Sequence, residues 1–352
     1  MNKYQIATIP GDGIGKEVIP ESSRVLDIVA AKCGFQVEYK NYDYSCEYFK
    51  KYGKMMPKDG LDRLRDSDSI FLGAVGYPGI PDHISLWGLL IPIRRNFQQY
   101  VNLRPVKLLK GIESPLRNPG TIDFYIVREN NEGEYSSIGG RLNDGSPQEL
   151  AVQESIFTRR GVDRVMKYAF ELASKRRFKL TSATKSNGIV HTMPYWDERF
   201  KAMAQKFPIV STDQFHIDIL AAHFVQKPDN FDVVVASNLF GDILSDLGPA
   251  VVGGMGIAPG ANINPDKQFP SMFEPVHGSA PDIAGKKIAN PIASIWTASM
   301  MLDHLGEKEG SNLIMNAIEE TISKGKVLTK DLGGNSNTEE VTNAIIDKIK
   351  RF

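Results

Sequence analysis

Two aspartates, Asp242 and Asp246, lie four residues apart in a segment with helical spacing. Residues 231–236 before them are mostly β-branched and apolar, which predicts a buried parallel strand. Asn238 is expected to cap the helix, and Gly248-Pro249 to end it. Both carboxylates then project from one helix face at the carboxyl edge of a sheet, where α/β folds bind ligands. With no Cys or His nearby, the pair suits Mg²⁺ or Mn²⁺; the alternative is a solvated face carrying two unrelated acids.

Three arginines and two proton carriers are the next candidates. Arg94, Arg104 and Arg128 each lie near the edge of a predicted element. Their guanidinium groups could bind the two carboxylates of a dicarboxylic acid through paired hydrogen bonds, or they could be ordinary surface arginines. Tyr135 and Lys185 are candidate proton carriers, because a lysine whose pKa is lowered by burial or by a metal can act as a base near neutrality.

The glycines Gly11, Gly13 and Gly15 follow a predicted strand. Their spacing differs from that of a dinucleotide fingerprint, in which the third glycine comes three residues after the second. A tight turn is therefore expected here, with a phosphate cradle as the less favoured alternative. The polar, small-residue loop 274–282 is better suited to close backbone contact with a nucleotide.

Strand patterns alternate with helical patterns along all 352 residues, which predicts two α/β lobes with a largely parallel sheet. A Gly-rich polar stretch at 133–144 is expected to form an arm. The expected strands are 4–9, 36–39, 70–74, 101–109, 124–127, 179–184 and 231–236. The expected helices are 11–33, 58–65, 87–100, 161–174, 292–305, 312–323, one capped by Thr192, one bearing Asp218, the acidic helix and one at the C-terminus.

Composition excludes several classes of function. The chain has 42 basic and 42 acidic residues, so no overall charge draws it to nucleic acid. Cys33 and Cys46 are too few for a disulfide framework or a thiolate zinc site. The N-terminus has no signal-peptide pattern, and the most apolar run, 86–93, is too short to span a bilayer. We therefore expect a cytoplasmic protein with no membrane partner.

Taken together, several motifs resemble the β-decarboxylating dehydrogenases of 2-hydroxy acids, a family that includes isocitrate, 3-isopropylmalate and tartrate/D-malate dehydrogenases. They are Gly11-Asp-Gly-Ile-Gly15, Asn102-Leu-Arg-Pro105, Arg128-Glu129 and the stretches 238–246 and 277–283. The stretches 82–88, 133–137, 182–188 and 193–199 are similar to the D-malate/tartrate branch. The resemblance implies an isopropylmalate-dehydrogenase-like fold. Its discontinuous cofactor domain would comprise 1–100 and 255–352, and 101–254 would bind substrate and metal and form a homodimer.

The resemblance also implies a role for each site residue. Arg94, Arg104 and Arg128, with Trp87 and Leu90, would contact a small dicarboxylic 2-hydroxy acid. Asp242 and Asp246, with the partner subunit's Asp218, would bind Mn²⁺ or Mg²⁺. The partner subunit's Lys185 would take the hydroxyl proton, and Tyr135 would protonate the enolate left by loss of CO₂. NAD would contact Glu274, His277, Gly278, Ser279, Ala280, Asp282, Asn290 and the partner subunit's Asn187, and a monovalent cation such as K⁺ is a further candidate.

Three other functions compete with oxidation of D-malate or tartrate. In 3-isopropylmalate dehydrogenases, a smaller or polar residue is expected near Trp87, whose indole would leave room only for an unsubstituted malate or tartrate. A catalytically silent regulatory subunit would be expected to lack a metal or proton-transfer residue, and all of them are present. A metal-dependent hydrolase would leave the loop at His277 unexplained.

Overall fold

The computed structural model describes residues 1–352, which form two compact units. The first unit comprises residues 1–99, 104–117 and 249–352, and the second comprises 100–103 and 118–248. Residues 104–117 and 249–254 were expected in the second domain but group with the first unit. Strand β4 (Val101–Lys107) begins in the second unit and ends in the first. The chain therefore leaves the first unit and returns to it.

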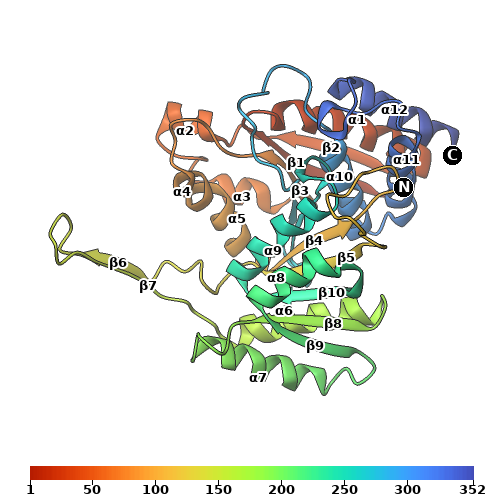
Figure 1. The fold of residues 1–352 in the computed structure, drawn as a ribbon. Coiled ribbons are helices and arrows are strands. Elements are labelled where there is room, and N and C mark those ends of the chain that lie inside the picture. The colour runs from red at the N-terminus through yellow and green to blue at the C-terminus, as the bar shows by residue number, and fades with distance from the viewer. The chain divides into compact units, whose positions relative to one another are not determined.

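The first unit contains a mostly parallel sheet with the strand order β2-β1-β3-β12-β11. Figure 1 labels β1, β2 and β3 of this sheet. Strand β1 (Lys3–Gly11) pairs in parallel with β2 (Gln36–Asn41) and β3 (Ser69–Ala74). Strand β12 (Ser271–Phe273) is parallel to β3, and β11 (Ala261–Ile263) is antiparallel to β12. The carboxyl ends of β1, β2 and β3 therefore meet at one edge, where the glycine turn and its neighbours lie.

Helices pack around this sheet. Helix α1 contacts α10, α11 and α12, and α10 also packs on α11. Most of α10 is buried because it is apolar on nearly all sides. The capping box of Asn337 and Glu340 starts α12. The bounds are α1 (Gly15–Cys33), α10 (Ile292–Leu305), α11 (Lys308–Lys324) and α12 (Thr338–Arg351), with 3₁₀ turns at Met255–Ile257 and Lys330–Leu332.

The segment before Arg94 is more broken than the expected helix at 87–100. Helix α4 (Asp82–Ser85) leads into a π-helix (Leu86–Leu90) and then α5 (Ile91–Asn96). Pro92 falls in the first turn of α5, directly after the π-helix, and its fixed φ is compatible with a helix. Helix α2 (Cys46–Tyr52), capped by Ser45, was not predicted, whereas α3 (Gly60–Arg65) was.

The second unit contains four parallel strands in the order β5-β10-β8-β9. The fourth, β9, was not predicted because its polar sequence lacks a β-branched run. The bounds are β5 (Asp123–Glu129), β8 (Lys179–Thr184), β9 (Ser211–His216) and β10 (Val233–Ala236). The helices are α6 (Arg159–Ser174), α7 (Thr192–Ala204) and α8 (Ile217–Gln226), with a 3₁₀ turn at Pro228–Asn230. The expected largely parallel α/β architecture is confirmed.

Two segments of the second unit differ in detail from expectation. The arm is a hairpin of β6 (Gly139–Leu142) and β7 (Leu150–Gln153), which extends away from the rest of its unit in Figure 1. Helix α9 (Asn238–Val251) runs through Gly248-Pro249, which was predicted to end it. Proline already has a helical φ, and its carbonyl accepts from the N–H groups of Val252 and Gly254, so the helix ends just beyond it. None of the helices is both long enough and apolar enough to cross a membrane.

Candidate active site

The acidic helix α9 is attached to the strand beside it through Arg128. Arg128 lies near the carboxyl end of β5, paired in register with Ala236 of β10, and is 4% exposed. Its Nε and Nη2 donate to Asn238 Oδ1 at 3.1 and 2.8 Å, and its Nη1 forms an ion pair with Asp242. Gly241 permits this approach, because a Cβ there would come within 2.5 Å of the Arg128 side chain. One arginine thus holds both the start of the helix and its first aspartate.

Tyr135 contacts the same carboxylate. Its hydroxyl donates to Asp242 Oδ2 at 2.7 Å, while the guanidinium of Arg128 lies 5.6 Å from the centre of the tyrosine ring. Asp246 lies one helical turn beyond Asp242 and is exposed. The structure therefore brings Arg128, Tyr135 and Asp242 together. It places Asp246 on the same face of α9 as Asp242.

The turn between Arg128 and Tyr135 is organised by a buried acid that sequence reasoning did not single out. Glu129 is 1% exposed, and its carboxylate accepts hydrogen bonds from the N–H groups of Asn131 and Glu132 at 2.8 to 3.0 Å. Burial raises the pKa of Glu129 from an ordinary 4.5 to about 7, despite those hydrogen bonds and the nearby charge of Arg164. The sequence pointed to Glu129 only through its place in the Arg128-Glu129 motif.

Lys185 and Asp218 form a second pair in the same unit. Lys185 follows β8, Asp218 lies in the first turn of α8, and their Nζ and Oδ1 atoms are 2.9 Å apart. The hydrogen bond from Lys185 lowers the pKa of Asp218. The Asp218 side chain is 62% exposed. No group of three acidic, His or Cys side chains in this single chain could hold a metal, so Asp218 does not join Asp242 and Asp246 here.

Arg94 and Arg104 lie in the first unit with a buried acid. Arg94 Nη2 is 2.7 Å from Glu274 Oε1, which also accepts from Asn262 Nδ2 at 2.9 Å. Burial works against ionisation of Glu274, but Arg94 and Arg104 outweigh it and keep its pKa below the ordinary value. Glu274 was expected among the cofactor residues, and in the structure its carboxylate forms an ion pair with Arg94.

Trp87 and Leu90, expected to contact the substrate, lie in the π-helix before Arg94. The Trp87 side chain is 37% exposed, and the guanidinium of Arg95 lies 5.1 Å from its ring. Leu90 packs partly buried against the core of this unit. π-helical turns occur often at functional sites because they change the direction of side chains along a helix.

The loop after Glu274 docks on the glycine turn. The N–H of Ile14 donates to the carbonyl of Ser279 at 2.9 Å, and a Cβ on Gly13 would lie 2.0 Å from that oxygen. Ala280 adopts a positive φ of 41°, which is uncommon for a residue with a side chain. The glycines therefore serve close packing, and the expected tight turn is present.

His277 offers an unused hydrogen-bonding atom in this loop. Its Nδ1 lies 3.1 Å from the carbonyl of Gly278 and must carry the proton, because a carbonyl only accepts. Its Nε2 is buried and has no hydrogen-bond partner. Burial lowers the pKa of His277, which favours a neutral ring with an acceptor at Nε2. A ligand that donates a hydrogen bond would pair with this atom if the loop moved to expose it.

The other expected cofactor residues differ in exposure. Asp282 and Gly278 are exposed, and Asn187 of the second unit is exposed as well. Asn290 is 7% exposed, and its amide already binds Asp331 at 2.9 Å and the N–H of Ile292 at 3.0 Å. Asn290 thus supports the protein in this structure, whereas the others have accessible surface.

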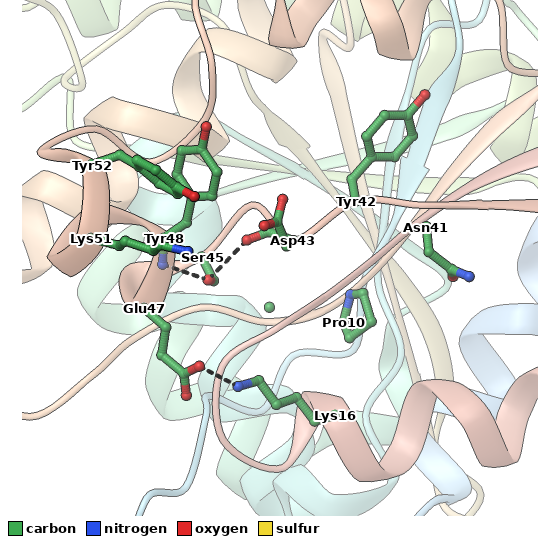
Figure 2. Close-up of a pocket in the computed structure, with 11 residues that line it drawn as sticks. Pro10, Lys16, Asn41, Tyr42, Asp43, Ser45, Glu47, Tyr48, Lys51 and Tyr52 are labelled. Carbon is green, nitrogen blue, oxygen red and sulfur yellow. Dashed lines mark hydrogen bonds and ion pairs between the residues drawn. The ribbon is translucent and has the colours of Figure 1, made fainter.

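A pocket of about 560 Å³ opens beside the glycine turn in the first unit (Figure 2). Figure 2 shows Tyr48 and Tyr52 on one side and Tyr42 on the other. Two lysines and two acids line it, so it has no net charge to attract phosphate, and Lys16 is already paired with Glu47 at 2.6 Å. Apart from Gly11, no residue of the motifs discussed above lines it.

Comparisons with known proteins show the family to which this chain is similar. The model of the isocitrate/isopropylmalate dehydrogenase family matches residues 5–345. The chain is 58% identical to D-malate dehydrogenase (decarboxylating) of Escherichia coli K12, over 100% of both chains. It is 56% identical to tartrate dehydrogenase/decarboxylase of Pseudomonas putida, covering 100% of this chain and 99% of the relative. The crystal structure of isocitrate dehydrogenase from Methylococcus capsulatus superposes with a TM-score of 0.89 at 33% identity, over 99% of this chain and 100% of that one.

The fold and these matches define an α/β dehydrogenase. The chain belongs to the isocitrate/isopropylmalate dehydrogenase family. The family resemblance stated from the motifs is therefore confirmed, and the roles of the individual residues stay predictions.

Proposed function

We propose that this protein catalyses the NAD-dependent oxidative decarboxylation of D-malate to pyruvate and CO₂ with Mn²⁺ or Mg²⁺, with related oxidation of tartrate. The observation that carries the proposal is the convergence of Arg128 and Tyr135 on Asp242. It supports a site in which an anion-binding group, a proton donor and a cation ligand meet. The two similar enzymes named above, one acting on D-malate and one on tartrate, support this choice of substrate.

The acids of α9 fit a hard divalent cation. Asp242 and Asp246 offer carboxylate oxygens at one helix face, but two ligands from one chain leave the site incomplete. In the proposal, the partner subunit's Asp218 and the substrate complete it. A bound cation would withdraw electron density from the 2-hydroxyl and stabilise negative charge on the enolate. Arg128 would then be released from Asp242 to bind a substrate carboxylate.

The chain's own residues account for the proton transfers. The partner subunit's Lys185 would take the proton of the 2-hydroxyl. NAD, when bound, would supply the acceptor for the hydride from C2. The product is a 2-keto acid whose far carboxylate is β to the new carbonyl, so its C–C bond breaks and CO₂ departs. The electron pair of that bond forms the enolate, and Tyr135 delivers a proton to its carbon. Arg94, Arg104 and Arg128 hold the substrate's carboxylates.

The first unit supplies the proposed cofactor site. In the proposal, His277 Nε2 and the backbone of 278–280 contact NAD, and Asn290 and the partner subunit's Asn187 complete the set. Asp282 is exposed and would repel the 2′-phosphate of NADP, which favours NAD over NADP. Comparing kcat/KM for the two cofactors tests this preference, and equal use of both would contradict it.

A homodimer with shared sites follows from the same assignment. Lys185 and Asp218 form a partly exposed pair that could enter a neighbouring subunit's site. Large apolar side chains are exposed on α8, α9 and the hairpin, as a self-complementary interface would require. They are Ile219, Val225, Leu239, Ile243, Leu142, Leu150 and Val152.

One experiment separates the candidate substrates. NADH formation is followed with Mn²⁺ and each of D-malate, L-tartrate, meso-tartrate, 3-isopropylmalate and isocitrate, with and without K⁺. The proposal expects the highest kcat/KM on D-malate or a tartrate, together with release of CO₂ from D-malate. Preference for 3-isopropylmalate would establish the alternative function. Absence of activity on all five would favour the non-catalytic subunit.

A further inference from the structure

Helix α9, which carries the proposed cation ligands, begins with an unusual arrangement of its cap. The carbonyl of Ser237 accepts the first helical hydrogen bond, from the N–H of Gly241 at 2.8 Å, so Ser237 is the capping residue. A capping serine normally accepts a hydrogen bond from an N–H of the first turn. Here its hydroxyl instead donates to Glu134 Oε1 at 2.7 Å.

Glu134 takes over the capping function from outside the helix. Its Oε2 accepts from the N–H of Leu239 at 3.0 Å, which satisfies one of the amides left without a partner at the helix start. A carboxylate at this end also interacts favourably with the helix dipole. Glu134, from the 129–135 turn, therefore adds a side-chain attachment to the first turn of α9, beside the contacts that Asn238 makes with Arg128 and with the carbonyl of Glu132.

The next residue contacts the same helix one turn further along. Tyr135 donates to Asp242 at 2.7 Å, three residues beyond Leu239. Adjacent residues of the turn are thus attached to α9 at two successive points. The position of the Tyr135 hydroxyl relative to Asp242 depends on both attachments, because the backbone between residues 134 and 135 is shared.

We propose that Glu134 is a positioning residue, which holds the Tyr135 hydroxyl in register with Asp242 by anchoring the turn to the start of α9. The inference rests on the proposed function, in which Tyr135 protonates the enolate. Loss of the anchor would leave the ligands of α9 in the sequence but let the proton donor shift against them. A shift of about 1 Å in a reacting group can cost about a hundredfold in rate.

The same turn provides a matched control. Glu132 holds the capping residue of another helix, since its carboxylate accepts from the N–H and the hydroxyl of Thr158, both at 2.8 Å, and Thr158 caps α6 by accepting from the N–H of Gly161. Glu132→Gln and Glu134→Gln therefore each remove one negative charge, and one carboxylate that supports the start of a helix, from the same turn. Only the second variant alters the attachment to α9.

The test measures kcat, KM for NAD and the solvent isotope effect on kcat, with D-malate and Mn²⁺ in H₂O and D₂O. Glu134→Gln is expected to lower kcat by about tenfold or more with KM for NAD unchanged. Its solvent isotope effect should exceed that of the wild type, because protonation by Tyr135 then limits turnover. Glu132→Gln is expected to keep the wild-type isotope effect, since loss of folded protein lowers the rate without changing that ratio.

A wild-type isotope effect in Glu134→Gln, or equal changes in both variants, would overturn the proposal. If Glu134→Gln does not fold, Ser237→Ala removes only one of the two contacts and should change the isotope effect in the same direction. An unchanged isotope effect there would also overturn it. If the wild type does not oxidise D-malate, the proposed function fails instead, so the two failures are distinguishable.

Discussion

Tyr135 and Asp242 share a 2.7 Å hydrogen bond in which the phenol donates to a carboxylate that Arg128 also holds. One aspartate therefore links a candidate proton donor to a candidate anion-binding group. A cation on Asp242 would weaken both contacts, because the carboxylate oxygens would then be shared. Loading the site would thus free Arg128 and Tyr135 to face the substrate.

Removing the charge of Asp242 tests its role. Asp242→Asn keeps the size of the side chain but weakens its affinity for a hard cation. We expect kcat to fall by about a thousandfold or more, since cation stabilisation of the developing charge is worth several kcal/mol. Isothermal titration with Mn²⁺ should show weaker binding. The thermal unfolding midpoint should fall only moderately: no core volume is lost, but the buried guanidinium of Arg128 loses its ion pair with Asp242. A variant with near-normal turnover would remove Asp242 from the metal site.

Glu129 predicts a pH dependence of stability. Its pKa rises on folding from 4.5 to about 7, so the folded chain binds more protons than the unfolded chain between these values. The free energy of unfolding should therefore fall by about 1 kcal/mol per pH unit as the pH rises through this window. Above the window, Glu129 should cause no further change. Glu129→Gln lacks this titration.

Urea unfolding of both proteins from pH 4.5 to 8 checks the Glu129 prediction. The stability of Glu129→Gln relative to the wild type should increase with pH up to about 7. Glu171→Gln, which removes a surface acid paired with Lys167 at 3.6 Å, serves as the control. Parallel stability curves for the wild type and Glu129→Gln would show that Glu129 does not titrate in this range.

The sequence predicted the elements that carry this site well where local rules decide the structure. Strand β8 was predicted to the residue, and the helix that presents Asp242 and Asp246 on one face is present. It could not reveal that Asn238 holds Arg128, or that Glu134 replaces the cap of Ser237, because these contacts join residues more than 100 positions apart. The polar edge strand β9 and the short helix α2 were missed because neither has an apolar period.

Trp87 is predicted to set the size of the substrate. Trp87→Ala should raise activity on 3-isopropylmalate relative to D-malate and lower kcat/KM for D-malate through looser positioning. A methylene-sized change in a pocket is worth about 1–3 kcal/mol, so a shifted ratio is expected in place of a complete switch. Tyr52→Ala, a change at another exposed aromatic residue, is the control. If the ratio of the two kcat/KM values is the same as in the wild type, Trp87 does not contact the substrate.

The last prediction is that each active site combines Asp242 of one subunit with Lys185 of the other. Two inactive variants, Lys185→Ala and Asp242→Asn, are mixed and their subunits allowed to exchange. In a mixed dimer, one site then has both normal residues and the other carries both changes. Random pairing makes about half the dimers mixed, and each mixed dimer has one intact site of its two. About a quarter of wild-type activity should therefore return.

The alternative arrangement gives a different result. If both residues came from the same subunit, every site in every dimer would carry one change, and activity would stay at the level of the parents. Native mass spectrometry shows whether mixed dimers have formed, so a negative result is informative. Lys185 and Asp218 lie together within one chain, and both are proposed to act in the partner subunit's site. Their pairing fits the shared arrangement, because one chain would then contribute both residues to its neighbour. Mixed dimers that remain inactive would place Lys185 outside the partner's site.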